Sequence, residues 1–434
     1  MPLNVVVSHS GKQHAYRHAL ALQRLGALRW FITSSYYAPS RWPDRWLSRV
    51  PALDRYLRRR HLDGLADRVI RQPLFELPEV LCRAAGRNGA WARDFVLHRD
   101  ALFDRWVAAA GLIPAASADV FWGFQGSCSD SLLAARAHGL TALVELATGH
   151  APAAERILGR ERERSPEWAD SISNAGFPRW YTRRLEAETE RADYCVVASA
   201  FTRRTLCESG VSEAKIRLLP LGADLDAFTF RRRSPEGPFQ ILFVGGVGQR
   251  KGIRYLLEAF DRIRSRTSAG RRHAGVRLVV AGPMVGSGRA FRAHARHVDY
   301  VGRVNPARVV QLMHESHVLA LPSLFEGFGL VIVEAMATGM PVVASTHSAA
   351  PEIVREGRDG YVVSPDDVEA LADRLTRLAE DRQGAVEMGV EAARRARAYG
   401  WGEHAHRLRV LCREIADRRA QGPGTLGGSE RHAG

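Results

Sequence analysis

The stretch from Leu321 to Ser345 constrains the fold more than any other part of the chain. An apolar segment, a glycine-containing turn, a helically spaced segment and a second apolar segment follow one another at residues 317–321, 327–329, 330–338 and 341–344. This order predicts a buried strand, a turn, a helix that Gly339 ends, and another strand. A glycine-rich turn at a helix N-terminus leaves backbone N–H groups unpaired and carries roughly half a positive charge, which suits a diphosphate.

Two glutamates, Glu326 and Glu334, stand in this segment with seven residues between them. A carboxylate does not help to hold phosphate, so in the functional interpretation both accept hydrogen bonds from the hydroxyls of a sugar and a ribose. In the alternative interpretation Glu326 caps the helix and Glu334 is a solvated helix residue. Because apolar residues surround Glu334, we expect it to lie among buried neighbours and to need a partner.

The length and charge of the chain limit the classes of protein that it can be. A chain of 434 residues with 46% hydrophobic residues is too long for one core, which predicts two or three globular domains. Lys and Arg number 62 against 47 for Asp and Glu, and this excess favours nucleic acid, anionic membrane or phosphorylated small molecules as partners. No basic low-complexity tail and no zinc-binding spacing supports nucleic acid.

Cysteines and the N-terminus bear on the compartment. The five cysteines are odd in number and scattered, which predicts reduced thiols in the core. The chain enters an apolar strand almost at once, with no charged region followed by a long apolar region, and no run of about 18 apolar residues occurs. We therefore expect a cytoplasmic protein.

Predicted strands and helices alternate along most of the chain. Further strands are predicted at residues 3–7, 119–124, 141–146, 193–198, 239–244, 276–282 and 298–302. Helices are predicted at residues 15–25, 131–138, 180–191, 366–380, 386–399 and 401–419. This alternation favours parallel α/β sheets.

Asp224 and Asp226 have the spacing of a metal-binding Asp-x-Asp pair. They precede Arg231–Pro238, whose proline, glycine and charged residues are typical of a linker, and no acidic cluster accompanies them. We therefore predict no metal site.

A second candidate phosphate site is the glycine-rich loop that follows the predicted strand at 239–244. Gly248 gives access to backbone N–H groups, Arg250 offers a fork of donors and Lys251 a point charge. Lysine occurs only at positions 12, 215 and 251, so a surface role for Lys251 is the weaker explanation. The dinucleotide pattern GxGxxG is absent from this loop.

His150 follows the predicted strand at 141–146, at the carboxyl end where open α/β sheets place their ligands. A catalytic role is one interpretation. The other is a histidine whose hydrogen bonds are satisfied within a loop or the core.

The segment from Arg41 to Arg60 interleaves tryptophans and leucines with arginines. One interpretation is a surface for an anionic membrane or a lipid-linked acceptor. The other is a pair of ordinary helices with a solvated basic face, because Pro43 and Pro51 interrupt any single long helix.

The segment that holds Glu326 and Glu334, continued through Ala350–Val354 and Gly360–Val363, resembles the Glu-x7-Glu motif of the retaining glycosyltransferases of family four. The resemblance is strong over residues 190–400 and weak before them. It implies the GT-B fold, an α/β fold of two Rossmann-like parallel-sheet domains that face an interdomain cleft.

The resemblance also implies a division of the chain. Residues 1–220 would form an acceptor-side Rossmann-like domain, 221–238 a linker, and 239–400 a Rossmann-like domain that binds the nucleotide sugar. Residues 401–420 would form a helix that crosses back to the first domain. Residues 421–434 are rich in glycine and are predicted to be disordered.

The implied activity is transfer of a sugar from a nucleoside diphosphate sugar to a glycan or lipid-linked acceptor, with retention and without a metal or cofactor. The implied catalytic residues are Glu326, Arg250, Lys251 and His150. The implied substrate-binding residues are Gly11, Gly248, Arg303, Gly327, Phe328, Gly329, Leu330 and Glu334.

The resemblance implies a role in glycan biosynthesis without a nucleic-acid partner. If the segment Arg41–Arg60 is a membrane surface, we expect weak association with the inner face of an anionic membrane. Two alternatives stay open at this point. One is a nucleotide-sugar epimerase of the same fold, which needs no acceptor. The other is a non-enzymatic nucleic-acid binder, which the two glutamates disfavour because carboxylates repel a phosphate backbone.

Overall fold

The computed structural model describes residues 3–12, 14–39, 42, 44–47, 49, 58, 60–76, 90–173, 176–268 and 275–421. By its internal contacts the chain divides into two units. Unit 1 comprises Met1–Glu145, Arg184–Cys195 and Ala405–Gly434, and unit 2 comprises Leu146–Arg183 and Val196–His404. The domain boundaries that the sequence suggests stay a prediction.

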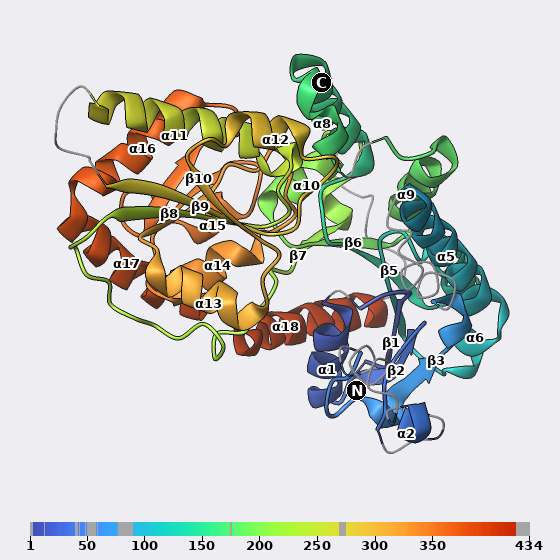
Figure 1. The fold of residues 1–434 in the computed structure, drawn as a ribbon. Coiled ribbons are helices and arrows are strands. Elements are labelled where there is room, and N and C mark those ends of the chain that lie inside the picture. Colours follow the sequence, from blue (N-terminus) through green and yellow to red (C-terminus); the bar gives the residue numbers. More distant parts are fainter. Residues whose placement is uncertain are drawn as a thin grey trace, which may run out of the picture. The chain divides into compact units, whose positions relative to one another are not determined.

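The first of two β-sheets has seven strands in the order β3-β2-β1-β4-β5-β6-β7 (Figure 1). Its strands are β1 Val5–His9, β2 Leu28–Thr33, β3 Val69–Arg71, β4 Val120–Phe124, β5 Thr141–Leu146, β6 Tyr194–Val197 and β7 Ile216–Leu218. The central strand β1 pairs in parallel with β2 and β4, and β4 pairs in parallel with β5. Every residue of β1 and β4 is buried, as expected for parallel strands with helices on both faces.

Helices connect the strands of this first sheet. They are α1 Ala15–Arg24, α2 Asp44–Leu47, α5 Ala90–Ala109, α6 Leu112–Ala115, α7 Ser129–Ala137, α8 Ala151–Arg164, α9 Arg179–Arg191 and α10 Ala200–Cys207. The helices predicted at 15–25, 131–138 and 180–191 are confirmed to within two residues at each end. Strand β2 and helices α5, α8 and α10 are absent from the sequence-based prediction.

The second sheet lies in unit 2 and has six strands in the order β10-β9-β8-β11-β12-β13. Its strands are β8 Phe239–Val244, β9 Val276–Ala281, β10 Val298–Gly302, β11 Val318–Leu321, β12 Val342–Ser345 and β13 Gly360–Val363. All its adjacent pairs are parallel. The predicted class of two Rossmann-like parallel sheets is therefore confirmed.

Helices cover both faces of the second sheet. They are α11 Ile253–Ser268, α12 Arg289–His294, α13 Pro306–Glu315, α14 Leu330–Ala337, α15 Ala350–Ile353, α16 Val368–Glu380 and α17 Arg382–Ala396. The last helix, α18 Trp401–Ala420, belongs to unit 1 from Ala405 onward. Figure 1 shows α11, α12 and α16 over one face and α13, α14 and α17 over the other. A hydrophobic core surrounds this sheet.

The stretch around Glu326 and Glu334 folds as predicted. The fully buried strand β11 pairs in parallel with both β8 and β12. Helix α14 begins after Gly329, whose φ is +86°, and ends before Gly339, whose φ is +84°. Only glycine adopts this left-handed conformation without steric cost, so both ends of the helix are set by residue type.

The predicted core thiols are only partly confirmed. Cys128 and Cys195 are buried and free, but Cys207 is exposed in the last turn of α10 and Cys412 is half-buried in α18. These two lie on helices that have a solvent-facing side, so their apolar sequence neighbours do not bury them. Cys82 lies outside the described residues.

Two further predictions fall largely outside the described residues. Within Arg41–Arg60, the described tryptophans Trp42 and Trp46 are 79% and 57% exposed, and the guanidinium of Arg49 stacks 4.0 Å from the Trp46 ring centroid. The predicted tail is described only at Gln421.

Among the helices of the described ranges, none combines the length and apolar character that crossing a membrane requires.

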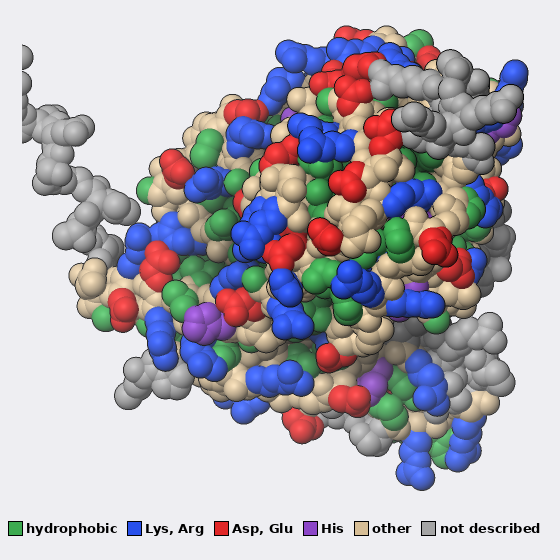
Figure 2. All heavy atoms as spheres, turned by 90° about the vertical axis from the view of Figure 1, so that its left-hand side faces the viewer, with side chains coloured by type: hydrophobic (Ala, Val, Ile, Leu, Met, Phe, Trp, Pro, Cys, Tyr) green, Lys and Arg blue, Asp and Glu red, His purple; other side chains and the backbone are tan. Residues whose placement is uncertain are grey.

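The basic excess is dispersed on the face that Figure 2 shows. Arginine and lysine side chains are intermixed there with acidic ones and form no single basic patch. Ion pairs such as Arg277–Asp299 and Arg308–Glu315, at 2.6 and 2.9 Å, compensate part of the basic excess of the chain. This face therefore lacks the continuous basic stripe that is typical of nucleic-acid binding.

Candidate functional site

Three loops of unit 2 follow the carboxyl ends of strands, where open α/β sheets bind ligands. They are Ala147–His150 after β5, Gly245–Gly252 after β8 and Pro322–Gly329 after β11. Two glycines let the first and third loops touch: a Cβ on Gly149 would overlap the ring of Phe325, and one on Gly327 would overlap the carbonyl oxygen of Ala147. The loops that carry His150 and Glu326 are thus packed directly against each other.

The loop Gly245–Gly252 is fastened to the third loop through its backbone. Gly252 has a φ of +70°, and a Cβ there would overlap the carbonyl oxygen of Pro322. The N–H of Leu324 donates to the carbonyl oxygen of Arg250 at 2.9 Å. These contacts present Arg250 and Lys251 to the turn that contains Glu326.

Lys251 forms an ion pair with Glu326, which lies 75 residues further along the chain. Both side chains are only 14% exposed, and Nη1 of Arg250 lies 3.6 Å from the same oxygen, Glu326 Oε2. Burial, with the charge of Arg250 nearby, lowers the pKa of Lys251 well below its ordinary value. Two cations predicted to hold phosphate and a carboxylate predicted to hold a sugar therefore form one cluster.

Arg250 uses part of its guanidinium group to hold neighbouring loops together. Its Nη1 donates to the carbonyl oxygen of Phe325 at 2.7 Å and its Nε donates to Oγ of Ser173 at 3.0 Å. Burial lowers the pKa of Arg250 to about 10, so it stays a cation at neutral pH. The open fork of donors expected from the sequence is thus reduced to the remaining guanidinium N–H groups.

The turn into α14 supplies backbone donors. Within the ranges that the structure describes, the N–H groups of Phe328, Gly329 and Leu330 have no acceptor. Such N–H groups at a helix N-terminus favour a bound anion. Anion binding by this turn stays a prediction.

Glu334 lies half-buried on the second turn of α14. The sequence predicts that it needs a partner, but no side chain in the described part of the chain forms a hydrogen bond or ion pair with its carboxylate. Burial, with Asp224 nearby, instead raises the pKa of Glu334 to about 7. The buried Glu334 carboxyl group therefore avoids an unpaired charge by keeping its proton up to a higher pH.

This pKa makes the stability of the fold depend on pH. Below pH 4.5, the ordinary value, Glu334 is protonated in both folded and unfolded chains, and its contribution to stability is lost as pH rises through about 7. The difference between the pKa values of Glu334 in the unfolded and folded chains corresponds to at most about 3 kcal/mol of stability. We expect Glu334→Gln to gain stability relative to the parent between pH 4.5 and 8 in urea unfolding. A stability difference between the two proteins that does not change with pH would contradict this.

His150 has a buried imidazole ring. It caps α8, its backbone N–H donates to Oγ1 of Thr205 at 2.9 Å, and its side chain is 3% exposed. Neither ring nitrogen has a hydrogen-bond partner among the described residues, and burial lowers the pKa of His150 to about 4. A neutral imidazole that can donate at one nitrogen and accept at the other suits a ligand, because an unsatisfied buried polar group is costly.

The other predicted binding residues differ in burial and in the unit to which they belong. Gly248 packs against the carbonyl oxygen of Ser171, and the side chain of Phe328 lies in the core, so each has only its backbone to offer. Leu330 packs partly against the same core. Arg303 is exposed after β10, and Gly11 lies in unit 1 beside His9 and Arg99.

A buried network that the sequence analysis missed holds the phosphate-binding candidate loop in place. Gln249, fully buried, donates from Nε2 to Glu161 at 2.7 Å, and its backbone N–H donates to Oγ of Ser171 at 3.0 Å. Tyr255 donates its hydroxyl to the other oxygen of Glu161 at 2.6 Å. The available signal was Glu161 itself, a carboxylate three residues after Leu158 on the apolar face of α8.

The structure brings together no group of three or more His, Cys, Asp or Glu that could hold a metal ion within its described ranges. Metal independence is not tested by this observation and stays a prediction.

Comparison with known proteins supports the resemblance to glycosyltransferases that the sequence analysis describes. Residues 238–381 match the family model described as "Glycosyl transferases group 1". The chain is 31% identical over 215 residues to glycogen synthase of Mycobacterium tuberculosis, covering 48% of this chain and 49% of that protein. It is 30% identical over 241 residues to D-inositol 3-phosphate glycosyltransferase of Corynebacterium urealyticum, covering 51% and 55%. The chain thus spans about half the length of the curated relatives that it matches.

Solved structures extend the likeness to nearly the whole fold. Sucrose-phosphate synthase from Thermosynechococcus elongatus superposes with a TM-score of 0.65 at 20% identity, covering 96% of this chain and 100% of that one. Anabaena HepE in complex with UDP and glucose gives a TM-score of 0.57 at 15% identity, covering 96% and 100%. At these identities the likeness shows the fold alone, and it confirms the predicted GT-B class.

Proposed function

We propose that this chain is a glycosyltransferase that moves a sugar from a nucleoside diphosphate sugar to an acceptor with retention of configuration. The ion pair between Lys251 and Glu326 carries the proposal. In a nucleotide sugar the sugar ring is bonded directly to the terminal phosphate, so a cation for that phosphate and an acceptor for a sugar hydroxyl must be neighbours. The loops after β8 and β11 place these two groups side by side.

Each residue then has a distinct task. Lys251, the remaining N–H groups of Arg250 and the free N–H groups before α14 stabilise the diphosphate as negative charge develops on it. Glu326 accepts a hydrogen bond from a sugar hydroxyl, and Glu334 accepts one from the ribose. The neutral His150 hydrogen-bonds the transferred sugar from the neighbouring loop.

The relatives support a nucleotide-sugar donor. The names of two sequence relatives state glycogen synthesis and transfer to D-inositol 3-phosphate, and HepE, a structure of the same fold, was solved with UDP and with UDP-glucose. We propose a nucleoside diphosphate sugar as the donor, a glycan or a lipid-linked molecule as the acceptor, and no metal or cofactor.

A ligand screen followed by product analysis tests this function. A nucleoside diphosphate sugar that binds the folded chain raises its melting temperature. The matching donor, incubated alone and then with an acceptor, should give a new glycoside only when the acceptor is present. Conversion of the donor without an acceptor would favour the epimerase. Tight, strongly salt-dependent retention of nucleic acid on filters would favour the nucleic-acid binder.

We also propose weak association with anionic membranes through the segment Arg41–Arg60. Trp42 and Trp46 are exposed, and the arginines around them suit a lipid headgroup layer. Sedimentation with vesicles that contain anionic lipid should show binding that weakens as salt rises, because attraction is screened over about 8 Å at physiological ionic strength. Absence of binding at low salt would leave ordinary packing as the explanation.

A further inference from the structure

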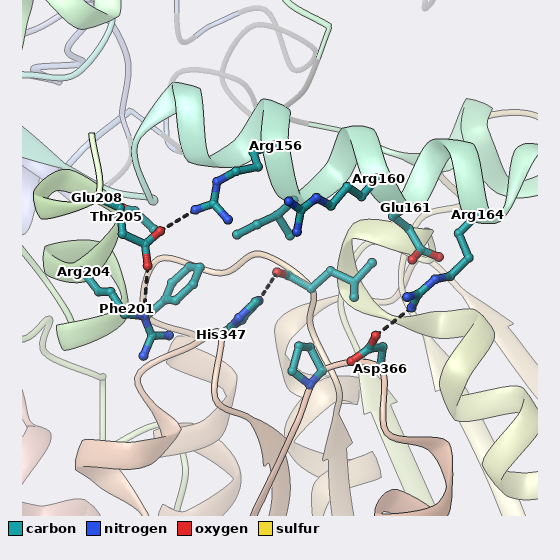
Figure 3. Close-up of a pocket in the computed structure, with 13 residues that line it drawn as sticks. Arg156, Arg160, Glu161, Arg164, Phe201, Arg204, Thr205, Glu208, His347 and Asp366 are labelled. Atoms are coloured by element: carbon teal, nitrogen blue, oxygen red, sulfur yellow. Dashed lines mark hydrogen bonds and ion pairs between the residues drawn. The ribbon is translucent and has the colours of Figure 1, made fainter. Parts of the chain in front are cut away.

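A cavity of about 240 Å³ lies in unit 2 beside the proposed site (Figure 3). Helices α8 and α10 form one side of it, and the loops after β11, β12 and β13 form the other. Complete ligand pockets usually measure about 300–1,000 Å³, so this cavity is too small for a nucleotide sugar and suits part of a smaller ligand.

The lining combines cations, acceptors and one aromatic ring. The guanidinium of Arg164 pairs with Asp366 at 2.6 Å, and Arg156 and Arg204 both pair with Glu208. Arg160 points from α8 toward the cavity in Figure 3 and forms no ion pair or hydrogen bond with any residue that the structure describes. The lining holds four arginines against three carboxylates, those of Glu161, Glu208 and Asp366, so its formal charge is positive by one.

His347 contributes an acceptor. Its Nδ1 lies 2.8 Å from the carbonyl oxygen of Leu324, which can only accept, so Nδ1 carries the proton. Burial lowers the pKa of His347, which keeps the ring neutral and leaves Nε2 as an acceptor. The ring stacks on Phe201 at 4.8 Å. An imidazole acceptor and a guanidinium together match a carbohydrate that carries an anionic group.

The cavity adjoins the residues proposed to act on the sugar. Thr205, in the lining, accepts the backbone N–H of His150 at 2.9 Å, and His347 accepts the backbone N–H of Glu326 through its carbonyl oxygen at 3.0 Å. Phe201 packs against Phe325 with ring centroids 5.4 Å apart. The loops that carry His150 and Glu326 are therefore each hydrogen-bonded directly to a residue that lines the cavity.

We propose that this cavity binds the acceptor, and that the acceptor is a carbohydrate carrying a phosphate monoester or a carboxylate that Arg160 contacts. The assignment to the acceptor rests on the proposed function. A guanidinium binds phosphate and carboxylate through the same planar donors, so both sources of charge satisfy the site.

Calorimetry with the full chain tests the proposal. Glucose 6-phosphate, glucuronate and neutral glucose are titrated at constant ionic strength, with and without saturating UDP. We expect at least one anionic sugar to bind, also in the presence of UDP, and more tightly than glucose. Arg160→Gln should weaken this binding about three- to tenfold, because the exposed guanidinium is partly screened. Arg160 is exposed and has no partner among the described residues, so the variant should fold normally.

Arg203→Gln is the matched control, since Arg203 is also exposed and lies beside Arg204 on α10 but does not line the cavity. It should bind the anionic sugar as the parent does. The proposal is overturned by equal binding of glucose, by displacement of the anionic sugar by UDP, by equal effects of the two variants, or by the absence of binding of both anionic sugars. Failure of the proposed function shows itself separately, as a protein that binds no nucleoside diphosphate.

Discussion

Replacing Lys251 by alanine is expected to lower the affinity for nucleoside diphosphate tenfold or more. The ammonium is the buried cation nearest to Glu326 and the candidate partner of the terminal phosphate. A hydrogen bond that involves a charged group is worth roughly 1.5–3 kcal/mol, which corresponds to this loss. Calorimetry of nucleoside diphosphate binding measures it directly.

The ion pair requires two controls. Lys215→Ala removes the same charge from the short 3₁₀ helix Glu213–Lys215 and should leave diphosphate affinity unchanged. Lys251→Ala alone also leaves the carboxylate of Glu326 without its main partner in a site that is 14% exposed, so it should lower stability as well. Adding Glu326→Gln should restore stability but not affinity. Unchanged diphosphate affinity in Lys251→Ala would remove Lys251 and Arg250 from the site.

Glu326→Gln is expected to lower turnover, whereas Glu334→Gln is expected to weaken nucleotide binding. If Glu326 holds a sugar hydroxyl more tightly as the glycosidic bond breaks, its replacement lowers turnover roughly 10- to 100-fold and hardly changes binding of the bare nucleotide. Glutamine keeps an oxygen for Lys251, so the loops should stay in place. Glu334→Gln should instead weaken the bare nucleotide also, because the ribose is present in both ligands.

Nucleoside diphosphate affinity and turnover, measured on both variants, decide the assignment. Both variants binding the bare nucleotide as the parent does would show that Glu334 does not contact the ribose. Loss of nucleotide binding in Glu326→Gln alone would exchange the two roles.

Local sequence determined the elements whose signals lie within a few residues of one another. The alternation of apolar runs with Gly329 and Gly339 predicted β11, α14 and β12, because positive φ angles at those glycines follow from residue type. Strand β2 and helix α8 were missed. The arginines and glutamates of α8 obscure its apolar stripe, whose burial comes from packing against distant segments.

The same limit applies to the site. The sequence identified Arg250, Lys251, Glu326, Glu334 and His150 as separate candidates, each from its own loop or helix. Only the tertiary structure decided that Lys251 pairs with Glu326 and that Arg250 donates to Ser173 and Phe325. It also decided that burial raises the pKa of Glu334. Ion pairing and burial depend on groups brought together across 75 or more residues, and no local pattern of residue types encodes those distances.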